Sequence, residues 1–236
     1  HFLKTCHNHG WIYKGHDAVP WCPRCETAIS QHEMLTEDYK EATHESIFVK
    51  LQISDEAWEN TSLVIWTTTP WTMPGNAAVG VNINYTYGVW KDQSGHQYIF
   101  LHKDDEGNVP VRQIKKQQHP INEYVFAHVE GDFEHVRDIS GQELLGLSYI
   151  APYDGLERVE AARAENKELF HSVVDASDLV NSEEGTGLLH IAPGAGTDDF
   201  RIAKKLGIPV VEVIKDDASY LDGFADLSGK NAKKHP

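Results

Sequence analysis

The feature that most constrains the fold of this chain is a series of short runs rich in β-branched and aromatic residues, separated by turn-forming residues. Such runs predict strands. We expect strands at 47–53, 62–66, 77–81, 86–90, 97–101, 124–129, 170–174, 187–191 and 210–214, and helices at 1–9, 161–169 and 197–206. Many short strands without regular alternation with helices favour a mainly β chain with peripheral helices (α+β), built on a closed or nearly closed β-barrel.

The chain is expected to have two parts. Residues 1–45 are turn-rich and polar, which is typical of a connector arm, and the strand pattern begins only after them. Residues 46–236 would form the β-barrel domain, with a polar surface excursion at 104–120. Because the chain begins without methionine and stops at Lys-Lys-His-Pro, we expect it to be a fragment of something larger.

Composition excludes several classes of protein. No apolar run approaches the length of a membrane span, so we expect no membrane association. Three cysteines, an odd number, argue against a disulfide framework and suit a reducing compartment, so a cytoplasmic location is expected. With 21 basic and 36 acidic residues the net charge is −15, so this chain is not expected to hold a nucleic-acid backbone tightly by itself.

The stretch Leu63–Asn76 combines a buried-strand pattern with a proline-containing end. Pro70 stops the strand, because proline has no amide hydrogen to donate to a neighbouring strand. Around this proline stand four threonines and two tryptophans: Trp66, Thr67, Thr68, Thr69, Trp71 and Thr72. Hydroxyls and free amides at a strand end can face a ligand. A threonine-rich strand that merely enters a Pro-Gly turn would have the same local pattern.

A second stretch, Gly185–Phe200, reads Gly-Thr-Gly-Leu-Leu-His-Ile-Ala-Pro-Gly-Ala-Gly-Thr-Asp-Asp-Phe. Asp199 falls in the first turn of the expected helix, where an acidic residue contributes about 0.3–1 kcal/mol, so stabilisation of the helix end is a sufficient local explanation. His190 alternates with apolar neighbours and faces either the core or a cavity. Gly187 is either a turn former or a place where the backbone passes close to a ligand.

These two stretches, in this order, resemble the editing (connective-peptide) domain of the isoleucyl-tRNA synthetases, a family of class I aminoacyl-tRNA synthetases. The related valyl and leucyl enzymes typically carry arginine at the position of Thr69 and an acidic residue at that of Trp71. The resemblance therefore favours the isoleucine branch, with an editing domain of the valyl or leucyl branch as the alternative. Ala195 stands where the family has a histidine, so any role of that imidazole is absent.

The resemblance implies post-transfer editing: hydrolysis of mischarged Val-tRNA(Ile) by a bound water, with hydrolysis of the valyl adenylate before transfer left open. It assigns the substrate's ammonium group to Asp199 and the steric exclusion of isoleucine to His190. Thr68 and Thr69 would act in catalysis by ordering the water, the ribose and the developing oxyanion. No cofactor would be needed for editing.

The remaining candidate residues would bind substrate or shape its site. These are Trp66, Thr67, Trp71, Thr72, Asn76 and Gly187. Asn76 would order the loop, and either tryptophan would wall in the terminal adenosine or belong to the core. The expected partners are the 3′ aminoacyl end of tRNA(Ile) and the rest of a parent synthetase, which would join isoleucine to tRNA(Ile) with ATP. The fragment itself is expected to be monomeric.

Cys22 and Cys25 form a Cys-x2-Cys pair in the arm, with Cys6 and His9 upstream. This spacing fits a structural zinc ion, which needs four ligands. Zinc-binding arms of the resembled family usually complete the site with a second cysteine pair, which is missing from this chain. Two other classes of function therefore stay open: a zinc-knuckle module that binds RNA through residues 1–35, and a purely structural insert.

Overall fold

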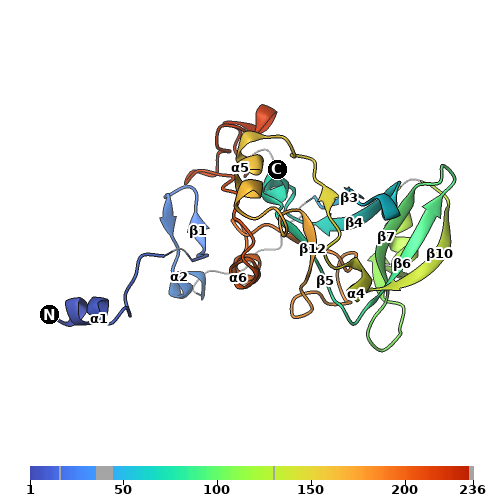
Figure 1. Ribbon diagram of the computed structural model, residues 1–236, viewed down its shortest axis with the longest axis horizontal. Coiled ribbons are helices and arrows are strands. Elements are labelled where there is room, and N and C mark those ends of the chain that lie inside the picture. The colour runs from blue at the N-terminus through green and yellow to red at the C-terminus, as the bar shows by residue number, and fades with distance from the viewer. Residues whose placement is uncertain (16, 36–44, 130, 234–236) are drawn as a thin grey trace.

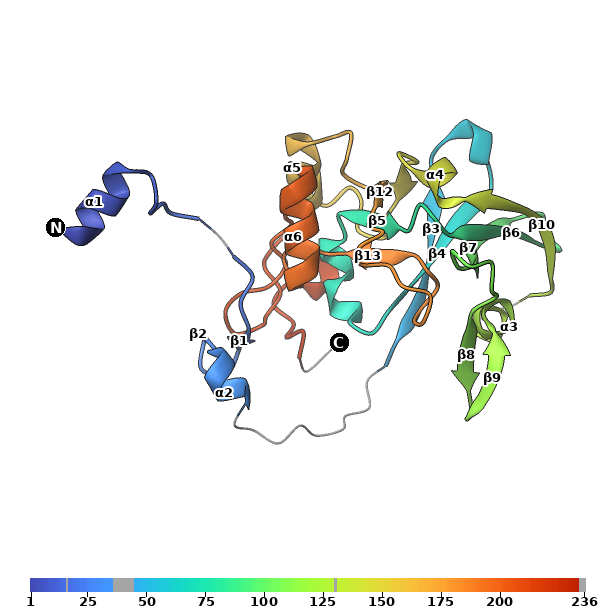
Figure 2. The same ribbon diagram turned by 90° about the horizontal axis from the view of Figure 1, so that it is seen from below.

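The computed structural model describes residues 1–15, 17–35, 45–129 and 131–233, and Figures 1 and 2 show it from two directions. The strands are β1 (Trp21–Cys22), β2 (Thr27–Ala28), β3 (Ile47–Ile53), β4 (Thr61–Thr67), β5 (Ala78–Val81), β6 (Thr86–Asp92), β7 (Gln97–Lys103), β8 (Val111–Ile114), β9 (Gln117–Pro120), β10 (Phe133–Ser140), β11 (Tyr149–Ile150), β12 (Ser172–Asp175) and β13 (Leu189–Ile191). The helices are α1 (Phe2–Asn8), α2 (Gln31–Leu35), α3 (Ile121–Phe126), α4 (Gly141–Leu144), α5 (Glu157–Glu165) and α6 (Thr197–Leu206), with 3-10 helices η1 (Glu56–Trp58), η2 (Pro70–Gly75) and η3 (Ala225–Leu227). The described chain is mainly β with peripheral helices, as predicted.

The larger sheet has six strands in the order β10-β6-β7-β4-β3-β11. Neighbouring strands are antiparallel except β4 and β7, which run parallel. Strand β4 lies in the middle of this order and is almost entirely buried, which explains its nearly continuous apolar sequence. Strand β4 ends at Thr67, and η2 begins three residues later, at Pro70.

The smaller sheet has three strands in the order β12-β5-β13 and lies between two hydrophobic cores. Side chains on successive strand residues point to opposite faces. Accordingly Val79 packs in the core shared with the larger sheet, whereas Ala78 packs in the core under helices α5 and α6. Figure 2 shows both helices beside this sheet. On β13, His190 pairs with Val79 of β5, so its side chain leaves the smaller sheet on the face toward the larger sheet.

The expected closed barrel is not confirmed. At one end of the six-stranded sheet, an isolated bridge between Ser148 and Ser172 joins the segment at β11 to the start of β12 in the smaller sheet. At the other end, β10 pairs only with β6 among the described strands, so the strands do not close into a ring. Seven of the nine expected strands are present among the thirteen described, but their pairing could not be predicted, because pairing depends on contacts between residues far apart in the chain.

Some segments were assigned wrongly from their sequence. Of residues 124–129, expected to be a strand, 124–126 form the end of α3 and 127–129 a turn after it, because Ile121, Val125 and Val129 are buried at helical spacing. Residues 210–214 show the burial alternation of a strand but have no strand partner in the described chain; Ile214 alone forms an isolated bridge, to Tyr220.

Other segments were shifted or missed. The helix expected at 161–169 lies four residues earlier, as α5. The polar excursion at 104–120 contains the hairpin β8–β9. Strand β10 was missed because it lies at a sheet edge and is mostly exposed, so its residues lack the apolar run used to find strands.

The described part of the arm lies to one side of the two main sheets in both views. Helix α1 stands apart from the other elements in both views, and β1 and β2 form a hairpin. That hairpin contacts the C-terminal segment, where Trp21 Nε1 donates to the Asp216 carbonyl at 2.8 Å. The predicted boundary at 45/46 adjoins residues 36–44, which lie outside the described residues. Within the described chain, none of the helices has the length and apolar character needed to span a membrane.

Candidate active site

The threonines after β4 form one side of a cavity, called here the threonine wall (Thr67, Thr68, Thr69 and Thr72). Pro70 ends the strand and begins η2, which folds the chain back so that these hydroxyls meet. Thr67 Oγ1 accepts from the Thr69 amide at 3.1 Å, and Thr72 Oγ1 donates to the Thr69 carbonyl at 2.8 Å. Thr69 Oγ1 lies 3.2 Å from Thr67 Oγ1 and 3.3 Å from Thr72 Oγ1.

His190 lines the cavity beside the threonine wall and is bonded to it, and its hydrogen bonds define its tautomer. Asn76 Nδ2 donates to the Ala78 carbonyl at 3.2 Å, so this atom is the amide nitrogen, and it lies 2.8 Å from His190 Nδ1. Nδ1 is therefore an acceptor, and the ring proton sits on Nε2, 2.9 Å from Thr72 Oγ1. Burial lowers the pKa of His190 to about 4, so the ring is neutral at pH 7.

Asn76 is itself held by two buried rings. Tyr149 donates its hydroxyl to Asn76 Oδ1 at 2.6 Å, and His171 Nε2 lies 2.9 Å from the Asn76 carbonyl oxygen. Burial raises the pKa of Tyr149 well above its usual range, so it keeps its proton. The result is a bonded chain from Tyr149 through Asn76 and His190 to Thr72, which fixes the threonine wall in one geometry.

Asp199 lies on the other side of the cavity, in the first turn of α6. Its Oδ2 accepts from the Ala192 amide at 2.9 Å, and its Oδ1 has no partner among the residues that the structure describes. Burial raises the pKa of Asp199 to about 6, against the opposing effect of the Ala192 hydrogen bond. The neighbouring Asp198 is exposed and pairs with Arg201 at 3.1 Å. Only one of the two adjacent acids therefore faces the cavity.

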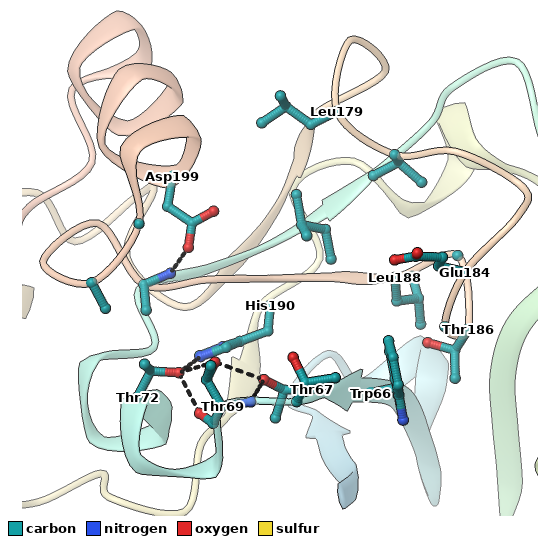
Figure 3. A pocket seen from close by; sticks show the side chains of 18 of the residues that line it. Trp66, Thr67, Thr69, Thr72, Leu179, Glu184, Thr186, Leu188, His190 and Asp199 are labelled. Carbon is teal, nitrogen blue, oxygen red and sulfur yellow. Dashed lines mark hydrogen bonds between the residues drawn. The ribbon is translucent and has the colours of Figure 1, made fainter. Parts of the chain in front are cut away.

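The cavity measures about 450 Å³. Figure 3 shows Asp199 on one side, the threonines on the other, and His190 between them. Residues from the two sequence stretches, more than 100 positions apart, thus line one space. A cavity of this size has room for an amino acid and part of a nucleotide, since pockets for small ligands commonly measure about 300–1,000 Å³.

All but one of the residues predicted to form the site line this cavity. Those that do are Trp66, Thr67, Thr68, Thr69, Trp71, Thr72, Gly187, His190 and Asp199. Asn76 does not: it is 1% exposed and acts on the site only through His190. Trp71 is half-buried and packs against the core under α5 and α6.

The glycines of the second stretch serve packing within the chain. At Gly187 the backbone has φ of +72°, and an added Cβ would lie 2.4 Å from Leu101 Cβ. At Gly185 φ is +60°, and an added Cβ would lie 3.0 Å from Trp66. The backbone at Gly187 therefore passes close to β7, which lets the segment lie against the larger sheet, while its close approach to a ligand stays a prediction.

Several residues at the cavity were not singled out from the sequence. Glu184 and Thr186 lie at the end near Trp66 in Figure 3, and the Thr186 hydroxyl is buried without a partner in the described chain. Thr186 stands inside the Gly-Thr-Gly motif, so this motif could have identified it as a candidate site residue. Tyr149 and His171 gave no local signal, because their role depends on contacts with Asn76, 73 and 95 positions away.

The predicted zinc ligands are only partly assembled. Cys22 and Cys25 face each other in the β1–β2 turn, where hydrogen bonds from Cys25 lower the pKa of the Cys22 thiol. Cys6 is in α1, with His9 at its C-terminal end, and Figure 2 shows that helix well apart from the hairpin. The described residues thus bring together two of the four ligands that structural zinc requires, and this does not fit a complete site.

Residues 1–192 match the family model of tRNA synthetases class I (I, L, M and V). The chain is 37% identical over 223 residues to the isoleucine–tRNA ligase of Methanocaldococcus jannaschii, a match that covers 94% of this chain and 20% of that protein. It is 34% identical over 233 residues to isoleucine–tRNA ligase 2 of Bacillus cereus, covering 99% and 19%. The chain therefore spans about a fifth of the length of these relatives.

Among solved structures, the editing domain of the P. knowlesi cytosolic leucyl-tRNA synthetase aligns with a TM-score of 0.45 at 17% identity. The alignment covers 70% of this chain and 63% of that one.

Proposed function

The chain belongs to the class I tRNA synthetases of the isoleucine, leucine, methionine and valine group, and from this membership we propose that its cavity edits aminoacyl-tRNA. The substrate would be Val-tRNA(Ile), cleaved by water to valine and free tRNA. The isoleucine–tRNA ligases among its relatives support tRNA(Ile) as the tRNA. The observation that carries the proposal is the half-bonded Asp199 carboxylate facing the threonine wall across one cavity.

Asp199 would bind the free α-ammonium group of the aminoacyl ester. Its Oδ1 is available, and at neutral pH it is ionised in spite of the raised pKa of about 6. A charge-assisted hydrogen bond in a partly desolvated site is stronger than one in water. Because the ammonium group is attached to the carbon next to the ester carbonyl, this contact would hold the reacting carbonyl in one place.

The threonine wall would position the water and stabilise the charge that develops on the carbonyl oxygen. Thr68 and Thr69 are exposed to the cavity, and the Thr68 hydroxyl has no partner in the described chain. Water adds to the carbonyl carbon, the ester carbon–oxygen bond breaks, and the ribose oxygen takes a proton. An ester of this kind is already activated, so positioned hydroxyls suffice without a covalent intermediate.

His190 would set the shape of the site and would not act as a base. Its Nδ1 lone pair accepts from Asn76, and its Nε2 proton is directed at Thr72, so neither nitrogen is free to take a proton from water. The pKa of about 4 agrees with this. A ring held rigidly at the cavity wall excludes a longer side chain by overlap, which is how valine would be accepted and isoleucine rejected.

The test compares Asp199→Asn with Asp198→Asn in the same turn of α6. Both changes remove one negative charge, but only Asp199 faces the cavity. We expect Asp199→Asn to lower kcat/KM for Val-tRNA(Ile) by about 100-fold or more, since leaving a buried charge unpaired costs about 3 kcal/mol. Asp198→Asn should retain activity. Equal activity of the two variants would contradict the amine-binding role.

A second measurement separates binding from turnover and tests the choice of substrate. A non-hydrolysable valyl-adenosine analogue that keeps its amine should bind the unmodified chain, measured by calorimetry, and bind Asp199→Asn at least about tenfold more weakly. The isoleucyl and leucyl analogues should bind less well than the valyl one. Tighter binding of a threonyl analogue would instead favour an editing domain of the valyl branch. Tighter binding of the isoleucyl analogue would favour one of the leucyl branch.

A further inference from the structure

A second cluster of polar side chains lies on the larger sheet, outside the cavity. His102 on β7, and His135 and Asp138 on β10, point to one place, where their ligand atoms lie within 4.8 Å of one another. His102 Nδ1 is 2.7 Å and His135 Nε2 is 2.8 Å from the same oxygen, Asp138 Oδ1. In the parts of the chain that the structure describes, this is the only such group of three or more potential metal ligands.

Two irregularities of the sheet bring these side chains together. In a regular strand, residues separated by three positions point to opposite faces. In β10 the register against β6 shifts between His135 and Arg137, so Val136 is an extra residue and His135 and Asp138 share a face. Bulges of this kind redirect side chains and are common beside functional sites.

A second register shift occurs between β6 and β7. Thr86 pairs with Lys103 and Tyr87 with Leu101, so His102 is the extra residue on its strand. Its neighbour Lys103 would ordinarily point to the other face, yet both reach Asp138, with Lys103 Nζ 2.9 Å from Asp138 Oδ2. Thus two separate bulges, on two strands, bring three side chains, those of His102, Lys103 and His135, to the carboxylate of Asp138.

The strand between them carries a glycine that leaves the necessary space. Strands β7 and β10 are separated by β6, so their side chains must meet across it. At Gly88, which pairs with Asp138, an added Cβ would lie 2.5 Å from Trp90 Nε1 and 3.3 Å from His102 Cβ. Any other residue at this position would therefore push the ring of His102 or of Trp90 away.

We propose that His102, His135 and Asp138 form a binding site for a divalent transition-metal ion such as Zn²⁺. Two imidazole nitrogens and one carboxylate oxygen are a donor set that Zn²⁺, Co²⁺ and Ni²⁺ accept, with water in a fourth position. Bond lengths of about 2.0–2.1 Å place tetrahedral ligand atoms about 3.3 Å apart. The present separations of 2.7 and 2.8 Å reach that value by a small side-chain rotation.

The surroundings suit such a site and leave it open to solvent. The side chains of His135 and Asp138 are 37% and 31% exposed, so an ion can enter. The carboxylate of Asp138 accepts from Lys103, and ring nitrogens of His102 and His135 lie 2.7 and 2.8 Å from its Oδ1. Lys103 holds the second carboxylate oxygen and leaves Oδ1 for the ion, the arrangement of an outer partner that orients a ligand. Bound metal would tie the edge strand β10 to β7.

The test must exclude the thiol pair of the arm, because thiolates are also ligands for these metals. We therefore start from Cys22→Ser/Cys25→Ser and titrate Zn²⁺ by calorimetry, and Co²⁺ by visible absorption, which reports coordination by nitrogen and oxygen. About one equivalent should bind. His135→Ala, on an exposed part of β10, should weaken binding at least about tenfold. His119→Ala is the matched control, because His119 pairs with Glu123 at 2.9 Å without a second imidazole.

Asp138→Asn provides a second variant that keeps the side-chain size, and far-ultraviolet circular dichroism shows whether each variant is folded. Loss of binding in the folded His135→Ala and Asp138→Asn variants, with His119→Ala unchanged, supports the site. The proposal is overturned if the Cys22→Ser/Cys25→Ser protein shows no saturable binding, or if His135→Ala binds as tightly as its parent. Neither result bears on editing, since the cluster is outside the cavity and the assays use no tRNA.

Discussion

The buried polar groups on the two sides of the cavity differ in how completely they are hydrogen-bonded. On the threonine side, His190 has both ring nitrogens bonded and is neutral, because burial lowers its pKa to about 4. On the opposite side, Asp199 keeps one oxygen without a partner in the described chain, and burial raises its pKa to about 6. A fully bonded group stabilises a shape, whereas a half-bonded carboxylate costs stability and retains the capacity to bind a cation. The comparison predicts opposite responses to mutation.

The largest expected effect is on the bonded side, with Asn76→Ala. This change leaves Tyr149 and His190 Nδ1 without a partner in the core, and such groups cost about 1–3 kcal/mol each. The free energy of unfolding should fall by about 3 kcal/mol or more. Urea denaturation measures it. A loss below about 1 kcal/mol would show that the chain of hydrogen bonds does not hold the threonine wall.

On the other side, Asp199→Asn should increase stability at pH 8. A folded pKa of about 6 against an ordinary value of 3.8 means that the ionised carboxylate is disfavoured in the fold, by about 2–3 kcal/mol above pH 6. Below about pH 3 the group is protonated in both states, so the difference should vanish. Urea denaturation at pH 3 and pH 8 measures both values; a variant that is less stable at pH 8 would contradict the comparison.

The next effect is on pH dependence. Only ionised Asp199 binds an ammonium group, so kcat/KM should fall about tenfold per pH unit below pH 6. His190 should contribute no step between pH 5 and 8, because its pKa is about 4. Deacylation of Val-tRNA(Ile) measured from pH 5 to 8 checks this, and Asp199→Asn should lack the acidic limb. An acidic limb that persists in Asp199→Asn would assign it to another group.

The smallest effect is expected for Tyr149→Phe. It removes one hydroxyl donor to Asn76 and leaves the ring in place, so the loss of stability should be about 1 kcal/mol. Because Tyr149 acts on the cavity through Asn76 and His190, its loss should loosen the wall and reduce the preference for the valyl over the isoleucyl substrate. Measuring kcat and KM with both substrates tests this. Unchanged selectivity at reduced stability would limit Tyr149 to a structural role.

Much of the fold could be predicted from local patterns. Strands β3, β4, β6 and β7 and helix α6 follow from runs of apolar residues and their period. The sheet order could not be predicted, and neither could β10, whose polar residues pair with β6 at an edge. Helix α3 was taken for a strand because Tyr124–Val129 is rich in residues that favour strands, and packing of its helical face prevailed.

Most residues of the candidate site could be identified from the order of residues along the chain. The threonine-proline stretch and the Gly-Thr-Gly…Asp-Asp stretch each carry their side chains in a short segment, where the order of residues settles what is present. What each of these residues faces depends on the folded chain. It turned Asp199 to the cavity and Asp198 to solvent, buried Asn76 behind His190, and recruited Tyr149 and His171 from distant segments. The reason is physical: burial and hydrogen-bond partners arise from contacts between elements far apart in the chain, and these set the protonation state and geometry of each side chain.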